Sequence, residues 1–356
     1  MLKIYLFSLS LFLSLFASQE AKKDLFDATQ YKYMKMKNRV FKGAIADYES
    51  CDDKGLTEKV FKRYEDLSKR EIGTIITGGM LVEPNKDFPI LRIDKDDYIK
   101  DFKKLTDLVH QNGANIIAQI SAIKDLDMPV SEIQRILDLF TDAAERCKKA
   151  GFDGIEIGAN HHGTLSQFLS PMFNHRTDEY GGSDENRARF IAEIIKKIRE
   201  RIGNEYIIIL KINSEDDDPN GITPEGFITA CKMAEQAGVD MIEVTGMKWK
   251  KNRENKLVYF DIGKTLADIL KIPIIVTGGI KNLNVANDAL NNSNIQYIGI
   301  CRAILSEPDI LIKWKNCGDK KSQCVSCMTC YNFEDHKEPE CIINKRKKKK
   351  NLAKSK

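Results

Sequence analysis

Short apolar runs alternate with longer amphipathic segments along most of the chain after residue 38. Eight of these runs are rich in Ile and Val and show little polar alternation, which is typical of strands that are buried on both faces. The eight predicted strands cover residues 40–46, 74–80, 115–121, 154–159, 206–213, 241–246, 272–279 and 296–301.

The segments between the strands have the period of amphipathic helices, and several carry helix-end signals. Capping residues such as Ser183 and Thr223 precede two of them, and Gly113 and Gly151 follow others. The predicted helices cover residues 60–70, 97–113, 131–151, 183–203, 223–238, 266–271, 282–291 and 307–315. Eight strand–helix repeats predict an α/β fold of the (β/α)8 TIM barrel type. An open doubly wound sheet is the alternative, but no G-x-G-x-x-G follows the first strand, which favours the barrel.

Both ends of the chain depart from this pattern. Residues 4–17 are almost wholly apolar, as in a secretory signal peptide, and are too short for a comfortable membrane span. We therefore expect residues 1–22 to lie outside a barrel that covers 23–316. A four-cysteine extension should follow over 317–344. The run KRKKKK at 345–350 predicts a solvated, disordered tail over 345–356.

Composition limits the class of protein. A chain of 356 residues with 42% apolar and 30% charged residues suits one globular barrel with appendages. The formal net charge of +4 is too small to indicate a nucleic-acid partner, and no stable membrane span is expected. A small molecule is therefore the expected partner, and a homo-oligomer stays open.

The ends of the last two predicted strands carry the residues of an anion site. In a barrel, functional residues lie at the C-terminal ends of the strands. The seventh strand ends in Gly278 and Gly279, and the eighth passes from Gly299 to Cys301 and Arg302. Glycines let backbone N–H groups approach an anion, and Arg302 would supply the countercharge. This pattern predicts a phosphate site, although glycines also form ordinary tight turns.

Three further strand ends carry polar side chains. Gln119 and Lys211 suit the polar edge of a flavin ring, because an amide bonds donors and acceptors and a lysine stabilises negative charge. His161 and His162 follow the fourth strand, where an imidazole can bond and polarise a carbonyl oxygen. Each of these residues could also have a purely structural role.

A long motif after the fourth strand resembles a known family. The segment 150–190 contains Leu169-Ser170-Pro171, the run from Arg176 to Gly182, and Glu185-Asn186-Arg187. It is similar to the old yellow enzyme family of NAD(P)H:flavin oxidoreductases. The resemblance covers roughly residues 24–345, in the same order, and the chain resembles a short form that has the barrel domain of the 2,4-dienoyl-CoA reductase type.

The resemblance implies an enzyme that binds FMN on a barrel. NAD(P)H would reduce the FMN, and hydride would then pass from N5 to a small electron-poor acceptor such as an activated alkene or a quinone. The FMN contacts that it implies are Ala44, Ile45, Ala46, Gly79, Gln119, Lys211, Gly279 and Arg302.

This chain departs from the family pattern around the acceptor. His161 matches the second residue of the family's carbonyl-binding pair, but the first position is Gly158. Gly163 stands where the family often has a proton-donating tyrosine, and Tyr48 is a candidate substitute. We expect His161 and Tyr48 to be the catalytic residues. The segment between Gln119 and residue 131 is short, which predicts an open barrel mouth.

Four cysteines after the barrel have a spacing that is typical of metal sites. Cys324, Cys327, Cys330 and Cys341 form a C-x2-C-x2-C-x10-C set. Long members of the family hold a [4Fe–4S] cluster in a similar place, so iron–sulfur, zinc and a simple thiol set are all open. Export would favour disulfides, whereas a flavin fold with free thiols favours the cytoplasm, and the compartment stays undecided.

Two other functions remain as alternatives. A phosphosugar aldolase or isomerase could use the same phosphate site, with Lys211 as a Schiff-base lysine. A flavin-binding protein with a decayed catalytic pair would explain Gly158 and Gly163.

Overall fold

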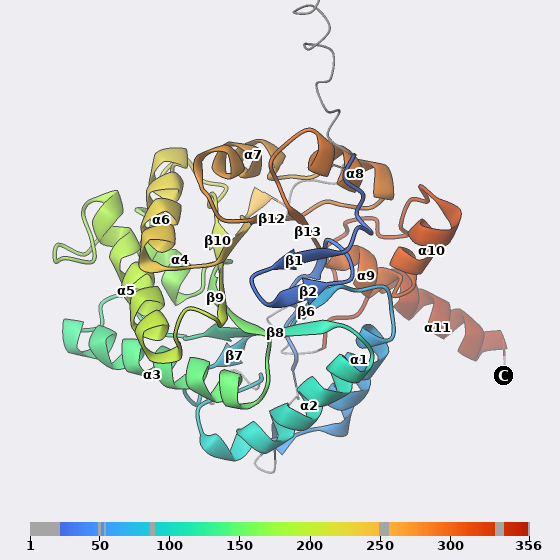
Figure 1. Cartoon of the computed structure of the whole chain (residues 1–356), viewed down its shortest axis with the longest axis horizontal. Coiled ribbons are helices and arrows are strands. Elements are labelled where there is room, and N and C mark those ends of the chain that lie inside the picture. The colour runs from blue at the N-terminus through green and yellow to red at the C-terminus, as the bar shows by residue number, and fades with distance from the viewer. Residues whose placement is uncertain are drawn as a thin grey trace, which may run out of the picture.

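Eight parallel strands close into a barrel, and helices surround it (Figure 1). This computed structural model describes residues 22–48, 51–52, 55–85, 90–248, 256–331 and 338–354. Around the barrel the strands are β3 (Val40–Lys42), β6 (Thr74–Ile76), β8 (Asn115–Ser121), β9 (Gly154–Ala159), β10 (Ile207–Asn213), β11 (Met241–Thr245), β12 (Ile274–Thr277) and β13 (Tyr297–Ile300). The pairing of β13 with β3 closes the ring. The predicted (β/α)8 barrel is therefore confirmed, and the open sheet is wrong.

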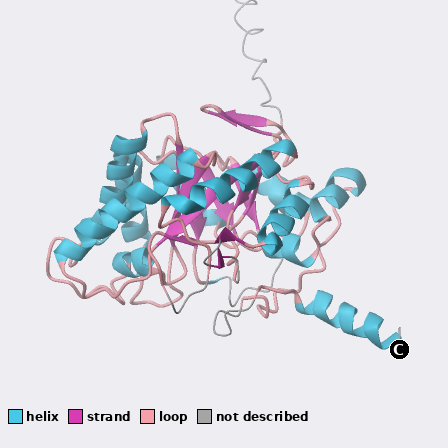
Figure 2. Ribbon diagram, turned by 90° about the horizontal axis from the view of Figure 1, so that it is seen from below, coloured by secondary structure: helices cyan, strands magenta, loops and turns pink. Residues whose placement is uncertain are grey.

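Short strands outside the ring cap one end of the barrel. An antiparallel hairpin of β1 (Thr29–Tyr31) and β2 (Met34–Met36) places Met34 and Met36 on the apolar residues at the beginnings of the barrel strands. Figure 2 shows this hairpin at the opposite end of the molecule from the C-terminal helix. The functional end of the barrel must therefore be the other one. The remaining short strands are β4 (Cys51–Asp52), β5 (Gly55–Leu56) and β7 (Met80–Leu81), of which β7 pairs with β8.

The helices pack their apolar faces on the outside of the barrel. Capping acts as predicted at two of them, where Ser183 and Thr223 each accept a hydrogen bond from a backbone N–H of the first turn. The helices are α1 (Glu58–Ser68), α2 (Ile99–Gln111), α3 (Val130–Lys149), α4 (Thr164–Leu169), α5 (Asp184–Ile202), α6 (Pro224–Ala237), α7 (Phe260–Ile269), α8 (Leu283–Asn291), α9 (Arg302–Ser306), α10 (Ile310–Cys317) and α11 (Ile342–Lys354), with a 3-10 turn η1 (Asp96–Tyr98) before α2.

One helix begins earlier than the sequence predicts. The prediction placed it at 266–271, whereas α7 starts at Phe260. Gly263, which would usually weaken a helix, lies so close to β12 that an added Cβ would be 2.5 Å from a methyl group of Val276. The glycine is therefore a close-packing residue here and not a helix breaker.

The C-terminal tail that was expected to be disordered forms helix α11. Lys and Arg are good helix formers. The start of α11 is held by Asn344, which donates to the carbonyl of Ser306 at 3.0 Å, and by Lys347, which donates to Gln323 at 2.7 Å. Beyond this anchor, α11 extends away from the barrel (Figures 1 and 2).

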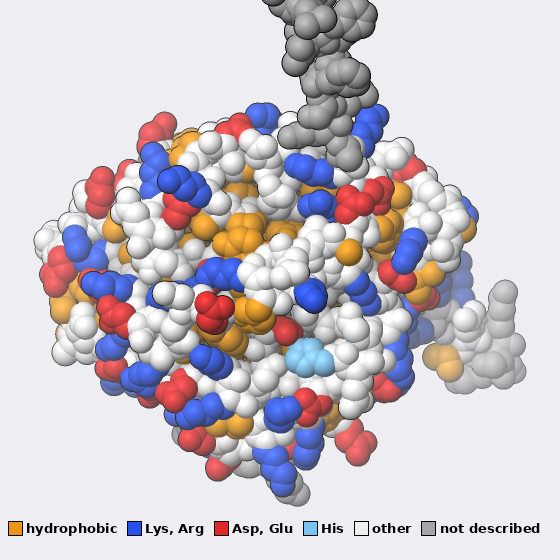
Figure 3. All heavy atoms as spheres, viewed as in Figure 1, with side chains coloured by type: hydrophobic (Ala, Val, Ile, Leu, Met, Phe, Trp, Pro, Cys, Tyr) orange, Lys and Arg blue, Asp and Glu red, His pale blue; other side chains and the backbone are white. Residues whose placement is uncertain are grey.

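The other predictions about the surface are tested only in part. The apolar segment at residues 4–17 lies outside the described residues. Among the residues that are described, no helix has both the length and the apolar character to cross a membrane. On the face shown in Figure 3, basic and acidic side chains are interspersed.

Candidate functional site

Two adjoining cavities lie at the carboxyl ends of the barrel strands. The larger has a volume of about 460 Å³, within the range of ligand sites. The two cavities share six lining residues: Ala44, His161, Lys211, Cys301, Arg302 and Tyr331. Every residue predicted from the sequence to contact FMN or the acceptor lines at least one of them. Those in the larger cavity alone are Ile45, Ala46, Tyr48, Gly79 and Gln119, and those in the smaller alone are Gly278, Gly279 and Gly299.

The smaller cavity has the backbone shape and the charge of an anion site. Gly278 and Gly279 have φ values of 136° and 95°, a region that L side chains rarely adopt. A Cβ on Gly279 would lie 1.9 Å from the carbonyl oxygen of Lys256, so only glycine fits. Arg302 supplies one cation, and Lys281, which the sequence reading missed, supplies a second. Lys281 lies in the loop after β12, two residues beyond the glycine pair, so the strand-end rule could have found it.

Buried charges lie beneath the larger cavity. Lys211 Nζ is 2.7 Å from Glu243 Oε1, and both side chains are almost fully buried. Burial alone would lower the pKa of Lys211, but Glu243 and Glu156 raise it above its usual value. Burial and the Glu243 charge raise the pKa of Glu156 well above its usual value, and Gln119 donates to Glu156 at 2.6 Å. These surroundings therefore favour the cationic form of Lys211 and the neutral form of Glu156.

These cavities fit FMN by their chemistry. The glycine pair with Arg302 suits the phosphate, and the amide of Gln119 with the cation of Lys211 suits the polar edge of the ring. Ala44 and Ala46 offer a small-residue surface beside them.

His161 is held by its backbone and by its ring. Its φ of 51° lies in the left-handed region, and its N–H donates to Asn213 Oδ1 at 3.1 Å. Its Nδ1 lies 2.9 Å from Asn160 Nδ2 and 2.5 Å from the hydroxyl of Tyr331. Neither Asn213 nor Tyr331 was predicted. Asn213 ends the same strand as Lys211, whereas Tyr331 is 170 residues away from His161 and gave no sequence signal.

The other predicted acceptor residues line the larger cavity. Tyr48 is buried and forms a β-bridge with Ile90, and burial raises the pKa of its hydroxyl. His162 lies next to His161 on the wall, with its Nε2 3.7 Å from Asp216 Oδ1. Gly158 and Gly163 leave the wall of β9 and its loop without side chains at two points.

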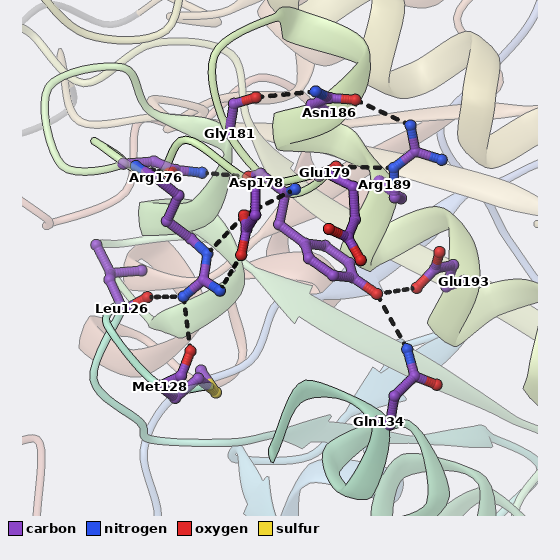
Figure 4. Close-up of polar contacts among 12 residues, drawn as sticks. Leu126, Met128, Gln134, Arg176, Asp178, Glu179, Gly181, Asn186, Arg189 and Glu193 are labelled. Atoms are coloured by element: carbon purple, nitrogen blue, oxygen red, sulfur yellow. Dashed lines mark hydrogen bonds and ion pairs between the residues drawn. The ribbon is translucent and has the colours of Figure 1, made fainter. Parts of the chain in front are cut away.

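The family motif braces the loop that follows β9. Arg176 donates to the carbonyls of Leu126 and Met128 at 2.6 and 2.7 Å, and also pairs with Asp178 (Figure 4). Because Leu126 and Met128 belong to the short segment between β8 and α3, the arginine ties the two loops together.

A second set of contacts fixes the same loop to the helices. Tyr180 donates to Glu193 of α5 at 2.8 Å and accepts from Gln134 of α3 at 3.0 Å (Figure 4). Arg189 of α5 donates to the carbonyl of Glu179 at 2.8 Å. The motif residues thus support the loop that carries His161 and do not themselves line either cavity.

The four cysteines line a third, small cavity beside Arg302. Among the residues that the structure describes, however, no group of three or more His, Cys, Asp or Glu side chains is arranged to hold a metal ion. Cys324, Cys327, Cys330 and Cys341 are free thiols. An iron–sulfur cluster or a zinc ion at these four cysteines therefore stays a prediction from their spacing.

The fold is the barrel on which flavin oxidoreductases of one large family are built. Comparison with known families agrees, since the NADH:flavin oxidoreductase / NADH oxidase family matches residues 24–125 and 121–320. The chain belongs to this family.

Individual relatives are similar along most of the chain. An N,N-dimethylglycine/sarcosine dehydrogenase from Chromohalobacter salexigens is 28% identical over 349 residues, which cover 86% of this chain and 50% of that protein. An NADPH dehydrogenase from Geobacillus thermodenitrificans is 29% identical over 315 residues, which cover 80% and 91%. An old yellow enzyme homologue from Zymomonas mobilis shares the fold, with a TM-score of 0.72, 19% identity, and coverage of 90% and 98%.

The chain spans about half the length of the first curated relatives that it matches, including 52% of an NADH oxidase from Thermoanaerobacter brockii.

Proposed function

We propose that the protein is an FMN-dependent NAD(P)H oxidoreductase that passes hydride to a small electron-poor acceptor such as an activated alkene or a quinone. The observation that carries this proposal is the gathering of residues from widely separated strands around two adjoining cavities. A glycine pair with Arg302 lies at one end, and Gln119 with Lys211 lies under the other.

In this proposal the residues of the chain bind FMN and orient the acceptor. Arg302 and the N–H groups near Gly279 hold the phosphate, and Lys281 adds a second positive charge. Gln119 and the charged Lys211 contact the polar edge of the ring. When bound, FMN supplies two-electron chemistry between a nicotinamide and an acceptor.

On the acceptor side, His161 would orient the carbonyl group of the acceptor, since it lines both cavities. Tyr48 lines the larger one and is the candidate proton donor, since a phenol is protonated at neutral pH and burial raises the pKa of this one further. The short segment after β8 supports access for small acceptors of more than one shape.

The aldolase alternative is disfavoured by the state of Lys211. A Schiff-base lysine must lose its proton to attack a carbonyl. Lys211 is instead paired with Glu243 at 2.7 Å, and its pKa is raised. Family membership argues in the same direction.

The test is to purify the protein, record its visible spectrum, and follow NADH and NADPH consumption with an enone and with a quinone. We expect a yellow protein that turns over at least one acceptor. The Arg302→Gln variant should lose FMN, whereas Lys264→Gln, on the exposed outer face of α7, should keep it. A folded wild-type protein that stays colourless in excess FMN would refute the proposal. A yellow protein that consumes no NAD(P)H would favour the decayed-pair alternative. Iron and zinc analysis of the same sample reports on the four cysteines.

A further inference from the structure

Tyr331 brings a hydroxyl to His161 from the C-terminal extension. The phenol oxygen is 2.5 Å from His161 Nδ1, and the two rings meet edge to face with centroids 5.5 Å apart. Tyr331 lines both cavities, as His161 does. The pair therefore lies where the two cavities meet.

The chemistry of the two groups sets the direction of this hydrogen bond. A phenol is a much stronger acid than a neutral imidazole N–H, and an imidazole nitrogen is a much better acceptor than a phenol oxygen. Tyr331 therefore donates and Nδ1 accepts. Asn160 Nδ2 lies 2.9 Å from the same nitrogen, farther away than the Tyr331 hydroxyl. With Nδ1 accepting, the proton of the neutral ring is on Nε2.

The wall of β9 explains why a hydroxyl from elsewhere has a role here. Gly158 stands where the family resemblance expects the first carbonyl-binding residue, and Gly163 where it expects a tyrosine. A Cβ on Gly158 would meet nothing closer than 3.5 Å, so this part of the wall is open. Tyr331 reaches His161 from a different segment of the chain.

We propose that Tyr331 is a positioning residue for the acceptor: its hydroxyl fixes His161 as the Nε2–H tautomer, so that the imidazole donates a hydrogen bond to the oxygen of a carbonyl acceptor. This inference rests on the proposed function and assigns part of its active site to the extension. The hydrogen bond from the His161 backbone N–H to Asn213 Oδ1 holds the backbone of His161, so the role of Tyr331 is to fix the imidazole ring.

The extension has other contacts that dock it without this hydroxyl. The N–H of Ser322 donates to the carbonyl of Lys281 at 2.7 Å, and Arg302 contacts the sulfur of Met328 at 2.9 Å. A Tyr331→Phe variant keeps the ring and these contacts. It therefore removes the hydrogen bond and leaves the segment docked.

The first test is spectroscopic and uses the FMN-loaded protein labelled with ¹⁵N-histidine. The chain has five histidines, and a His161→Gln variant identifies the signals of His161. We expect a protonated Nε2 and a hydrogen-bonded, unprotonated Nδ1 in the wild type. In Tyr331→Phe the Nδ1 signal should move toward that of a less strongly bonded nitrogen. A protonated Nδ1 in the wild type, or signals that Tyr331→Phe leaves in place, would overturn the proposal.

The second test is kinetic. In Tyr331→Phe, kcat/KM for an enone should fall about tenfold, the usual worth of one hydrogen bond, while ferricyanide, which has no carbonyl, is reduced as before. Tyr33→Phe, which removes a hydroxyl from the β1–β2 turn at the other end of the barrel, should change neither. Equal losses with both acceptors would show a merely structural role and refute the proposal. A wild-type protein that binds FMN but reduces no carbonyl compound would refute the proposed function alone, since the histidine signals are read independently.

Discussion

Replacing Lys211 by methionine removes the cation from a buried ion pair and leaves the carboxylate behind. Lys211 Nζ lies 2.7 Å from Glu243 Oε1, and the two side chains are 4% and 0% exposed. Breaking such a pair by removing one partner costs about 3–5 kcal/mol, because the remaining charge is desolvated and uncompensated. We expect the free energy of unfolding at pH 7 to fall by that amount.

The penalty should depend on pH in a defined direction. In the wild type, burial tends to raise the pKa of Glu243, but the charge of Lys211 and hydrogen bonds hold it below its usual value. Without Lys211 the effect of burial opposes only the hydrogen bonds to Glu156 and Thr277, so we expect the folded-state pKa of Glu243 to lie above the unfolded value. The folded variant then binds more protons than the unfolded chain, and its stability falls as the pH rises above about 4.3, the ordinary pKa of a glutamate. The difference from the wild type should therefore shrink toward low pH.

Urea unfolding of both single variants and of the double variant Lys211→Met/Glu243→Gln measures the pair. The double variant should recover about 2–3 kcal/mol relative to the sum of the single changes, since neither charge is left alone. Because Lys211 is also a proposed FMN contact, each protein is unfolded with and without added FMN. A single Lys211→Met variant that loses less than about 1 kcal/mol in both conditions, with no coupling, would refute the reasoning.

Three further predictions concern other parts of the barrel. The Glu156→Gln variant should become more stable relative to the wild type as the pH rises from about 4.3, because the raised pKa of Glu156 makes the wild type lose stability over that range. Melting temperatures of both proteins, measured across this pH range, check the prediction, and a constant difference between them would contradict it. The Gly279→Ala variant should bind FMN about 10- to 100-fold more weakly in a flavin fluorescence titration, because a φ of 95° is strained for any residue with a side chain. As a control, Gly113 has a φ of 73° with open space around it, so Gly113→Ala should lower the stability of the protein but not its affinity for FMN. Cys317 is exposed and should react rapidly with a thiol reagent, whereas Cys147 is buried, which also raises the pKa of its thiol, and should react only when the protein unfolds. Faster labelling of Cys147 than of Cys317 in the folded protein would show that this packing is wrong.

The barrel could be predicted because its strands are buried on both faces and its helices on one. These two patterns differ in period, so the boundaries of strands such as β8 and β9 agree with the predicted runs to within a residue. The pattern failed where one residue type has two uses. Gly263 is a helix breaker by propensity but a close contact in α7, and the basic run at 345–350 is a disordered tail by charge but a helix in the structure.

The site residues could be predicted from the sequence only where they lie at or near the ends of the barrel strands. Gln119 and Lys211 each lie two residues before the end of their strand, and the barrel rule brings strand ends together whatever their separation in sequence. Lys281 and Asn213 satisfy the same rule and could have been included. Tyr331 satisfies no such rule, because its place depends on how an irregular extension folds back over the barrel. The four cysteines have the regular spacing of a metal site, but no metal-binding group is found among the described residues, so that site stays a prediction.

The bracing contacts of Arg176 and Tyr180 have a consequence for evolution. The stretch by which a protein of this family is most readily recognised is a scaffold element, fastened to α3, α5 and the segment after β8. These contacts do not involve the side chains at positions 158, 161 and 163, so substitutions there leave the platform braced. We therefore expect that substitutions at these positions can change the acceptor while the signature stays intact.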